Sequence, residues 1–174
     1  MLSKLGLVAL VLSLLAPLGA RADTTYLAPD AFLREVFVEP PQPSVLWLDK
    51  STQAAITATL GHPYPLARLR YWRAHNKSVW ILDEIGKEYP ITAGFVVDDA
   101  RIRRAEVLIY RETRGMEIHL PAFLAQFAGN ALDGNQLREP VDGITGATLS
   151  VDAMRRMAST ALTLDRIALS RNAQ

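Results

Sequence analysis

Hydrophobic and polar residues alternate most regularly in the middle of the chain. Three segments there are typical of strands: residues 79–83, 91–97 and 102–110. Alternation of apolar and polar residues is clear in the third of them. Turn-forming residues separate them, with Gly86 in the first connection and Asp98-Asp99-Ala100 in the second. The pattern predicts a meander of three antiparallel strands. We expect Gly86 to supply a positive φ at its turn, and a slip in the alternation near Arg104 predicts a bulge.

Helical periodicity and capping residues mark the elements around this meander. We expect helices over residues 30–37, 51–60, 121–127 and 151–171, and a further strand over residues 66–72. Asp49 or Ser51 can cap the second helix, and Gly61 ends it. Ser150 is the expected N-cap of the last helix, whose apolar stripe faces the core. The sequence therefore predicts an α+β fold, with an antiparallel sheet packed against helices.

The first 22 residues differ from the rest of the chain. Lys4 precedes an apolar run over residues 5–18, and Ala20-Arg21-Ala22 follows it, which is the three-part pattern of a cleaved secretory signal. A retained membrane anchor is the alternative, but a spanning helix needs about 20 apolar residues. This run is shorter and contains Pro17. We expect cleavage before Asp23, no membrane span in the mature chain and, in a bacterium with two membranes, a periplasmic location.

Charge and cysteine content exclude several classes of function. The 174 residues include 19 basic and 18 acidic side chains, a formal balance of +1. The chain therefore lacks the strong positive charge with which nucleic-acid-binding proteins hold phosphates, and we expect no nucleic-acid partner. The absence of Cys excludes disulfides, a thiolate nucleophile and a Cys-ligated iron–sulfur cluster. Redox chemistry would need a cofactor that is not held through sulfur.

The candidate binding site is the loop that leads into the last helix. It reads Asp142-Gly143-Ile144-Thr145-Gly146-Ala147-Thr148-Leu149-Ser150. Its small residues allow a ligand to approach the backbone, and the free N–H groups of a helix N-terminus favour an anion such as a phosphate. On these grounds alone, an ordinary capped loop without a ligand is the alternative.

This loop resembles the D-x-x-[ST]-G-A-T-x-[ST] signature of the FMN-binding domain family. The family includes the flavin-bearing periplasmic subunits of sodium-pumping NADH:quinone reductase and of the Rnf electron-transport complex. Two further segments are similar to family elements and stand in the family's order: Glu112-Thr113-Arg114-Gly115-Met116-Glu117, which lies near the flavin in the family, and Gln126-Phe127-Ala128-Gly129, from the element after it. The resemblance extends over about residues 79–169.

The resemblance implies FMN as the cofactor, joined covalently through its phosphate to Thr148 by a dedicated flavin transferase that uses FAD. The other residues implied in cofactor binding are Thr145, Gly146, Ala147, Ser150, Glu112, Thr113, Gly115, Met116 and Glu117. The transferase would recognise Asp142 together with Gly146, Ala147 and Thr148. The resemblance implies neither a catalytic residue nor a metal.

The resemblance also predicts how the chain is organised and what it does. Residues 66–174 would form the FMN-binding domain, after the signal over residues 1–22 and a helical and extended segment over residues 23–65. The implied function is that of a periplasmic electron carrier between a membrane-bound reductase and another acceptor, without substrate turnover of its own. Its partners would be the flavin transferase and a membrane-bound or periplasmic redox partner. The alternatives are a flavin-dependent reductase that acts directly on a small substrate and a non-redox binding module that has lost the flavin.

Histidine and glutamate residues give weaker indications of chemistry. His62, His75 and His119 lack the spacing of metal ligands, so we expect no metal site. Glu112 and Glu117 are candidates for paired acid–base catalysis, but their spacing in an extended or looped segment does not fix the distance between the two carboxylates. A position beside the flavin, which the resemblance implies for both, is the stronger hypothesis.

A basic cluster stands at the start of the third meander strand. Arg101, Arg103 and Arg104 follow the expected turn. The cluster is either a solvated sheet edge or a docking surface for an acidic redox partner.

Overall fold

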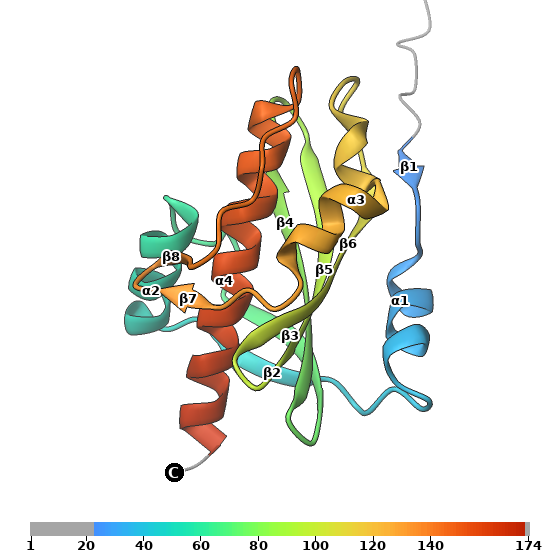
Figure 1. The fold of residues 1–174 in the computed structure, drawn as a ribbon. Coiled ribbons are helices and arrows are strands. Elements are labelled where there is room, and N and C mark those ends of the chain that lie inside the picture. The colour runs from blue at the N-terminus through green and yellow to red at the C-terminus, as the bar shows by residue number, and fades with distance from the viewer. Residues whose placement is uncertain (1–22, 173–174) are drawn as a thin grey trace, which may run out of the picture.

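The computed structural model describes residues 23–172, so the expected signal over residues 1–22 lies outside the described part of the chain. The described part combines four α-helices with a six-stranded antiparallel sheet in the order β1-β6-β5-β4-β3-β2 (Figure 1). The α+β class predicted from the sequence is confirmed. The strands of this sheet are Thr24–Thr25 (β1), Ser44–Trp47 (β2), Arg68–Ala74 (β3), Lys77–Ile85 (β4), Pro90–Asp98 (β5) and Arg101–Tyr110 (β6).

Helices and a small hairpin complete the chain. The α-helices are Pro29–Val36 (α1), Lys50–Leu60 (α2), Pro121–Leu124 (α3) and Thr148–Asn172 (α4). Two 3₁₀ turns flank α3, and a two-stranded hairpin follows: Met116–His119 (η1), Ala125–Phe127 (η2), Leu132–Asp133 (β7) and Gln136–Leu137 (β8). The helix expected over residues 121–127 is thus a short α-helix that tightens into a 3₁₀ turn. Among residues 23–172, no helix is both long and apolar enough to cross a membrane.

The predicted meander forms the centre of the sheet. Strands β4, β5 and β6 pair in turn as antiparallel neighbours. The predicted bulge is confirmed, because Val96 pairs with Arg104 whereas the next residue, Val97, pairs with Ile102. Arg103 is therefore the extra residue of β6, and a bulge of this kind increases the local twist of the strands.

The turn between β4 and β5 corrects the expectation for Gly86. Its backbone does not adopt a positive φ. A Cβ atom at this position would lie 3.0 Å from both Oε1 of Glu112 and Cδ1 of Ile91. Glycine is needed here for space, not for a special backbone angle. The positive φ angles of the meander belong to the turn between β5 and β6, at Asp99 (51°) and Ala100 (57°).

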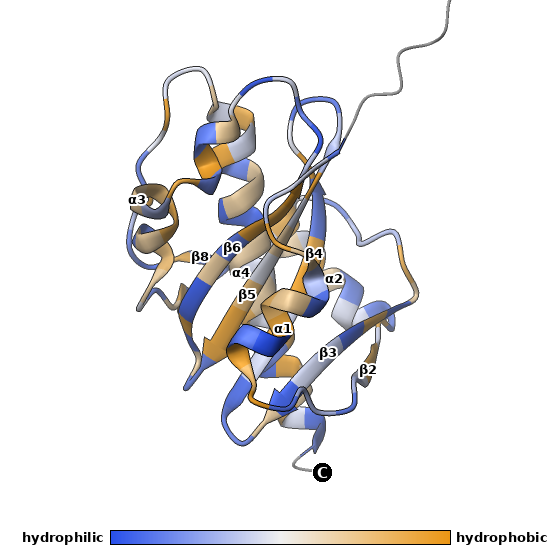
Figure 2. Cartoon of the chain, turned by 90° about the vertical axis from the view of Figure 1, so that its right-hand side faces the viewer, coloured by the Kyte–Doolittle hydropathy of each residue, from blue (hydrophilic) through white to orange (hydrophobic). Residues whose placement is uncertain are grey.

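The sheet lies between two helical layers. Helices α2 and α4 cover one face and α1 lies across the other, as Figure 1 shows from the side and Figure 2 from the α1 face. The larger core, on the α2 and α4 side, contains the fully buried Trp80 and Phe95. The smaller core, under α1, contains Phe32, Val79 and Val96. Burial of both faces explains why β5 is apolar almost throughout instead of alternating.

The sequence pattern does not predict the two edge strands. β1 pairs with the end of β6, with Thr24 opposite Tyr110. β2 pairs with β3, with Leu46 opposite Leu69. Both edge strands come from residues 23–65, so this segment adds a strand to each side of the sheet.

Helix α4 begins earlier than predicted. Its first residue is Thr148, and Ser150 lies within the first turn, so the expectation that Ser150 is the N-cap is wrong. For α2, the two candidate caps are resolved in favour of Asp49, whose side chain accepts a hydrogen bond from the N–H of Thr52 at 2.8 Å. Gly61 ends α2 in the left-handed conformation, as predicted.

Candidate functional site

Thr148 is the first residue of α4, and its side chain is exposed. The N–H of Val151 donates to the carbonyl of Ala147 at 2.9 Å. The N–H groups of residues 148–150 precede this bond and have no such acceptor four residues back within the helix. Gly146, with φ at 84°, has no other atom within 4 Å of the position of a Cβ. An exposed hydroxyl therefore stands beside N–H groups that lack an acceptor within the helix, at its positive end, an arrangement that favours an anion.

Tyr110, at the end of β6, connects the two main segments of the site. Its buried phenol donates a hydrogen bond to the carbonyl of Arg114 and lies 3.1 Å from Oγ of Ser150. Each hydroxyl has one hydrogen, so Ser150 is the donor in the second bond. Burial raises the pKa of Tyr110, which keeps the phenol protonated and able to donate. Ser150 thus has a structural partner inside the protein.

Gly115 allows close contact between the same two segments. Its φ is 83°, and a Cβ atom there would lie 3.1 Å from Cβ of Ala147, from Oγ of Ser150 and from the hydroxyl of Tyr110. A side chain at residue 115 would push the segment 112–117 away from the start of α4. The structure therefore brings together two of the three segments on which the resemblance rests.

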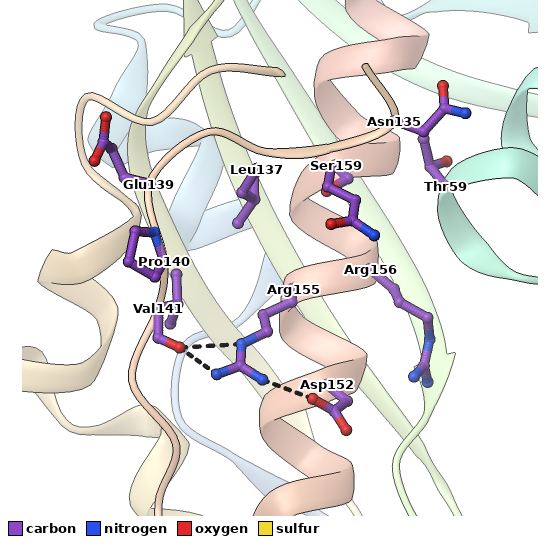
Figure 3. A pocket seen from close by; sticks show the side chains of 11 residues that line it. Thr59, Asn135, Leu137, Glu139, Pro140, Val141, Asp152, Arg155, Arg156 and Ser159 are labelled. Atoms are coloured by element: carbon purple, nitrogen blue, oxygen red, sulfur yellow. Dashed lines mark hydrogen bonds and ion pairs between the residues drawn. The ribbon is translucent and has the colours of Figure 1, made fainter. Parts of the chain in front are cut away.

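The third segment contacts the same loop through Gln126. Its side-chain oxygen accepts a hydrogen bond from the N–H of Asp142 at 2.7 Å. The carbonyl of Val141, in the same peptide unit, accepts from the guanidinium of Arg155, with Nε at 3.1 Å. Figure 3 shows this contact together with the bond from Arg155 to Asp152, at 2.8 Å. One peptide unit at the entrance of the loop is thus held at both its N–H and its carbonyl end.

Glu112 has a structural role in the adjoining turn. Its Oε1 accepts hydrogen bonds from three successive backbone N–H groups, those of Lys87 and Glu88 at 2.6 Å and that of Tyr89 at 2.9 Å. The carboxylate therefore closes the turn between β4 and β5, in the space that Gly86 leaves open. This contact fixes the turn beside the segment 112–117.

The other residues implied by the resemblance present exposed side chains around Thr148. Thr113, Glu117 and Thr145 are exposed. Met116 and Leu149 are apolar but 49% and 50% exposed. Exposed apolar groups on both segments, next to the anion-favouring end of α4, fit a molecule with a flat apolar ring system and a phosphate.

His119 lies against an aromatic ring from the N-terminal part of the chain. It stacks on Tyr26, with ring centroids 4.1 Å apart and planes inclined by 5°. Its Nδ1 is hydrogen-bonded to the carbonyl of Met116. Burial, and to a lesser extent the charge of Glu117, raise the pKa of Tyr26. Among residues 23–172, no group of three or more His, Asp or Glu side chains is placed to hold a metal ion.

A hollow of about 390 Å³ lies on the other side of the loop, between α2, α4 and the β7–β8 hairpin (Figure 3). Hydroxyls of Thr59 and Ser159 and the guanidinium groups of Arg155 and Arg156 line it. Neither Thr148 nor the segment 112–117 contributes to its wall. The hollow is therefore separate from the surface on which the resemblance places the cofactor.

The sequence indicates Thr148, Gly115 and Gln126 as site residues, but it does not indicate the residues that hold them in place. Tyr110 is a buried strand residue in the alternating pattern, and Arg155 is one of several arginines on a helix. No local signal distinguishes these two residues, because their partners are 40 and 14 residues away in the sequence.

Comparison with known proteins agrees with this geometry. Residues 86–163 match the family model of the FMN-binding domain. No curated protein and no solved structure matches the chain. The matched range includes all three segments that meet around Thr148. Residues 86–163 therefore form an FMN-binding domain.

Proposed function

We propose that this protein is an exported electron-transfer flavoprotein that carries FMN covalently on Thr148. The observation that carries the proposal is the position of Thr148: an exposed hydroxyl on the first residue of a 25-residue helix, within the matched family segment. FMN supplies one- and two-electron transfer when bound, whereas the protein supplies position and electrostatics. The absence of Cys agrees with a cofactor that is attached through a hydroxyl.

The attachment chemistry requires an accessible Thr148. Its hydroxyl oxygen forms a bond to the phosphorus of the FMN half of FAD, and the P–O bond of the pyrophosphate to the AMP half breaks. AMP leaves, and the hydroxyl proton passes to a base on the flavin transferase. The resulting phosphodiester keeps one negative charge at the N-terminus of α4, where the free N–H groups and the helix dipole stabilise it.

The neighbouring residues have different roles in this proposal. Gly146 keeps the approach to the backbone open, and Ala147 is small and buried. Asp142 is exposed at the entrance of the loop, and its carboxylate would repel a phosphate. We therefore assign Asp142 to recognition by the transferase, whereas its N–H holds the loop through Gln126.

Export explains why a covalent bond is useful. A cofactor that is held only by reversible contacts dissociates, and a protein outside the cytoplasm has no ready supply of FMN. The pattern over residues 1–22 supports export, and the periplasm is the proposed location. There the protein would accept electrons from a membrane-bound reductase and pass them to another acceptor.

Intact mass spectrometry tests the attachment. Co-expression with a flavin transferase should give a yellow protein that is heavier by one FMN minus one water. Thr148→Ala should abolish the mass shift, and Thr148→Ser, which keeps a hydroxyl, should retain it. Ser170→Ala is the matched control, because it removes an exposed hydroxyl from the other end of the same helix. A wild-type protein that stays unmodified would contradict the proposal.

A further inference from the structure

A second hollow lies near the opposite end of α4. It has a volume of about 400 Å³ and lies between the turn that joins β5 to β6, the β7–β8 hairpin and the second half of α4. Arg166 is in its wall, 18 residues after Thr148. At about 1.5 Å of rise per residue, the two positions are separated by about 27 Å along the helix. The hollow is therefore remote from the proposed site of the flavin.

Three arginines from three different parts of the chain line this hollow. Arg101 begins β6, Arg138 follows β8, and Arg166 lies on α4. Arg138 and Arg166 form no hydrogen bond or ion pair through their side chains with any residue of the described range 23–172. Arg101 donates to the carbonyl of Gly129 at 2.9 Å, a neutral acceptor that leaves its charge uncompensated.

The acidic residues of the wall already have partners. Asp99 lies 3.9 Å from Arg103 and accepts from Asn76 at 3.2 Å. Asp165 is 2% exposed and pairs with Arg73 and with Ser78. Arg103 also lies 3.9 Å from Asp98, so the five arginines and three aspartates of the hollow and its immediate partners carry a net charge of +2.

This arrangement differs from the basic cluster seen in the sequence. Arg104 pairs with Glu35 at 2.8 Å and with Glu106 at 2.9 Å. Arg103 lies beside Asp98 and Asp99. The basic cluster of the sequence therefore does not form one surface, and of its three arginines only Arg101 lines the hollow.

The floor of the hollow is apolar. Ala131, Leu132, Leu162 and Leu169 contribute to it, and Leu169 is 44% exposed. A lone inorganic anion would be held by the arginines but would leave this apolar surface uncovered. The near-neutral chain does not provide the extended positive surface that a nucleic acid requires. Carboxylates with an aliphatic side chain between them match both the charge and the apolar floor.

We propose that this hollow is a docking site for an acidic segment of a protein partner. Carboxylates of that segment pair with Arg101, Arg138 and Arg166, and an aliphatic side chain contacts the leucines of the floor. Because the site is at the far end of α4, a bound partner leaves the surface around Thr148 accessible. The inference rests on the charge and shape of this hollow and is independent of the flavin proposal.

A fluorescently labelled peptide of alternating Glu and Leu residues is a suitable probe, with its binding followed by anisotropy at low salt. Changing Arg138→Gln and Arg166→Gln together should weaken binding by about tenfold, since two exposed ion pairs are lost. The matched control is Arg34→Gln with Arg70→Gln, which removes the same charge from exposed positions outside the hollow and should leave the affinity unchanged. Circular dichroism would verify that both double variants are folded.

Two further measurements make the test decisive. A peptide of the same length with Gln in place of Glu should not bind, because the guanidinium groups need carboxylates. Inorganic phosphate at the same concentration as the peptide should fail to displace it, because phosphate makes no contact with the apolar floor. Equal loss in the two double variants, binding of the Gln peptide, or displacement by equimolar phosphate would each overturn the proposal.

Discussion

The hydroxyl oxygens of Tyr110 and Ser150 lie 3.1 Å apart, which ties the end of β6 to the first turn of α4. Tyr110 also donates to the carbonyl of Arg114, so one phenol joins the strand, the segment 112–117 and the helix. Ser150 is two residues after Thr148, and its contact fixes the direction in which the helix begins. We therefore expect Tyr110 to act as a positioning residue for Thr148, through Ser150.

Replacing Tyr110 with Phe should lower both stability and the rate of flavin attachment. The change keeps the ring but removes the hydroxyl, which leaves the carbonyl of Arg114 and Oγ of Ser150 without their partner. We expect a loss of about 1–3 kcal/mol in the free energy of unfolding. Urea unfolding measures the first effect, and the time course of the mass shift with a purified transferase measures the second.

Tyr64→Phe is the matched control for this variant. The hydroxyl of Tyr64 is also buried and accepts from the N–H of Asp83 at 3.0 Å, but it has no bond to the attachment loop. This control should lose a similar amount of stability and keep the normal attachment rate. If both variants slow attachment equally, the effect comes from stability and Tyr110 has no specific positioning role.

Two glycines with the same backbone conformation should differ in their response to alanine. Gly115 and Gly129 have φ angles of 83° and 81°, so Ala at either position costs about 1 kcal/mol in backbone strain. At Gly115 the new Cβ would also lie 3.1 Å from three atoms, whereas at Gly129 nothing lies within 4 Å. Gly115→Ala should therefore lose about 1–3 kcal/mol more than Gly129→Ala in urea unfolding. Equal losses would show that contact at Gly115 is not tight.

The sequence predicts the central elements because their signals are local. Apolar runs bounded by turn residues identify β4 and β5, alternation identifies β6, and the slip near Arg104 identifies the bulge. The edge strands β1 and β2 have two and four residues and are held by pairing with distant strands, so they give no local pattern. The start of α4 is a similar case, because Ser150, the expected cap, lies in the first turn and is hydrogen-bonded to the distant Tyr110.

The contacts of the site residues, like the edge strands, are only partly predictable from local sequence. The motifs of the resemblance indicate which segments belong together, and Gly115 and Gln126 do meet the loop before α4. Glu112, in contrast, is engaged by three N–H groups of a turn more than 20 residues earlier, and nothing in its own segment indicates this. The motifs thus indicate which segments lie next to one another. The hydrogen bonds within the site cannot be read from them, because these depend on how the whole sheet packs.

Gln126 and Arg155 should act on attachment as a pair. They hold the N–H and the carbonyl of one rigid peptide unit, between Val141 and Asp142. Gln126→Ala or Arg155→Ala alone should release this unit and slow attachment, and the double variant should be only slightly slower than either one. The kinetics of the mass shift for all four proteins form a double-mutant cycle. Independent, multiplicative effects would contradict a shared restraint.

Asp152→Asn is the control for the Arg155→Ala variant. It removes the charged partner of Arg155 but leaves the contact with the carbonyl of Val141. Attachment should remain close to the wild-type rate. A loss as large as that of Arg155→Ala would show that the ion pair, and not the restraint on the peptide unit, is what matters.

The contact of His62 with the buried carboxylate of Glu84 should make stability depend on pH. This carboxylate accepts hydrogen bonds from Nε2 of His62 at 3.0 Å and from Arg156 at 2.8 Å. Nδ1 of His62 lies 3.0 Å from the carbonyl of Pro63, so both ring nitrogens face acceptors and the protonated ring satisfies both. The hydrogen bond to Pro63 raises the pKa of His62, and the hydrogen bond and charge of Glu84 raise it further, against the opposing effect of burial.

The sign of the effect follows from this raised pKa. The stabilising contribution of His62 is complete below the pKa of the unfolded chain, about 6.5, and is lost as the pH rises through the higher pKa of the folded state. Urea unfolding between about pH 5.5 and 8.5 should therefore show wild-type stability falling with pH more than that of His62→Gln. His75→Gln, a change in the turn between β3 and β4, should keep the wild-type dependence. If His62→Gln showed the full wild-type slope, the protonated contact with Glu84 would not contribute to folding.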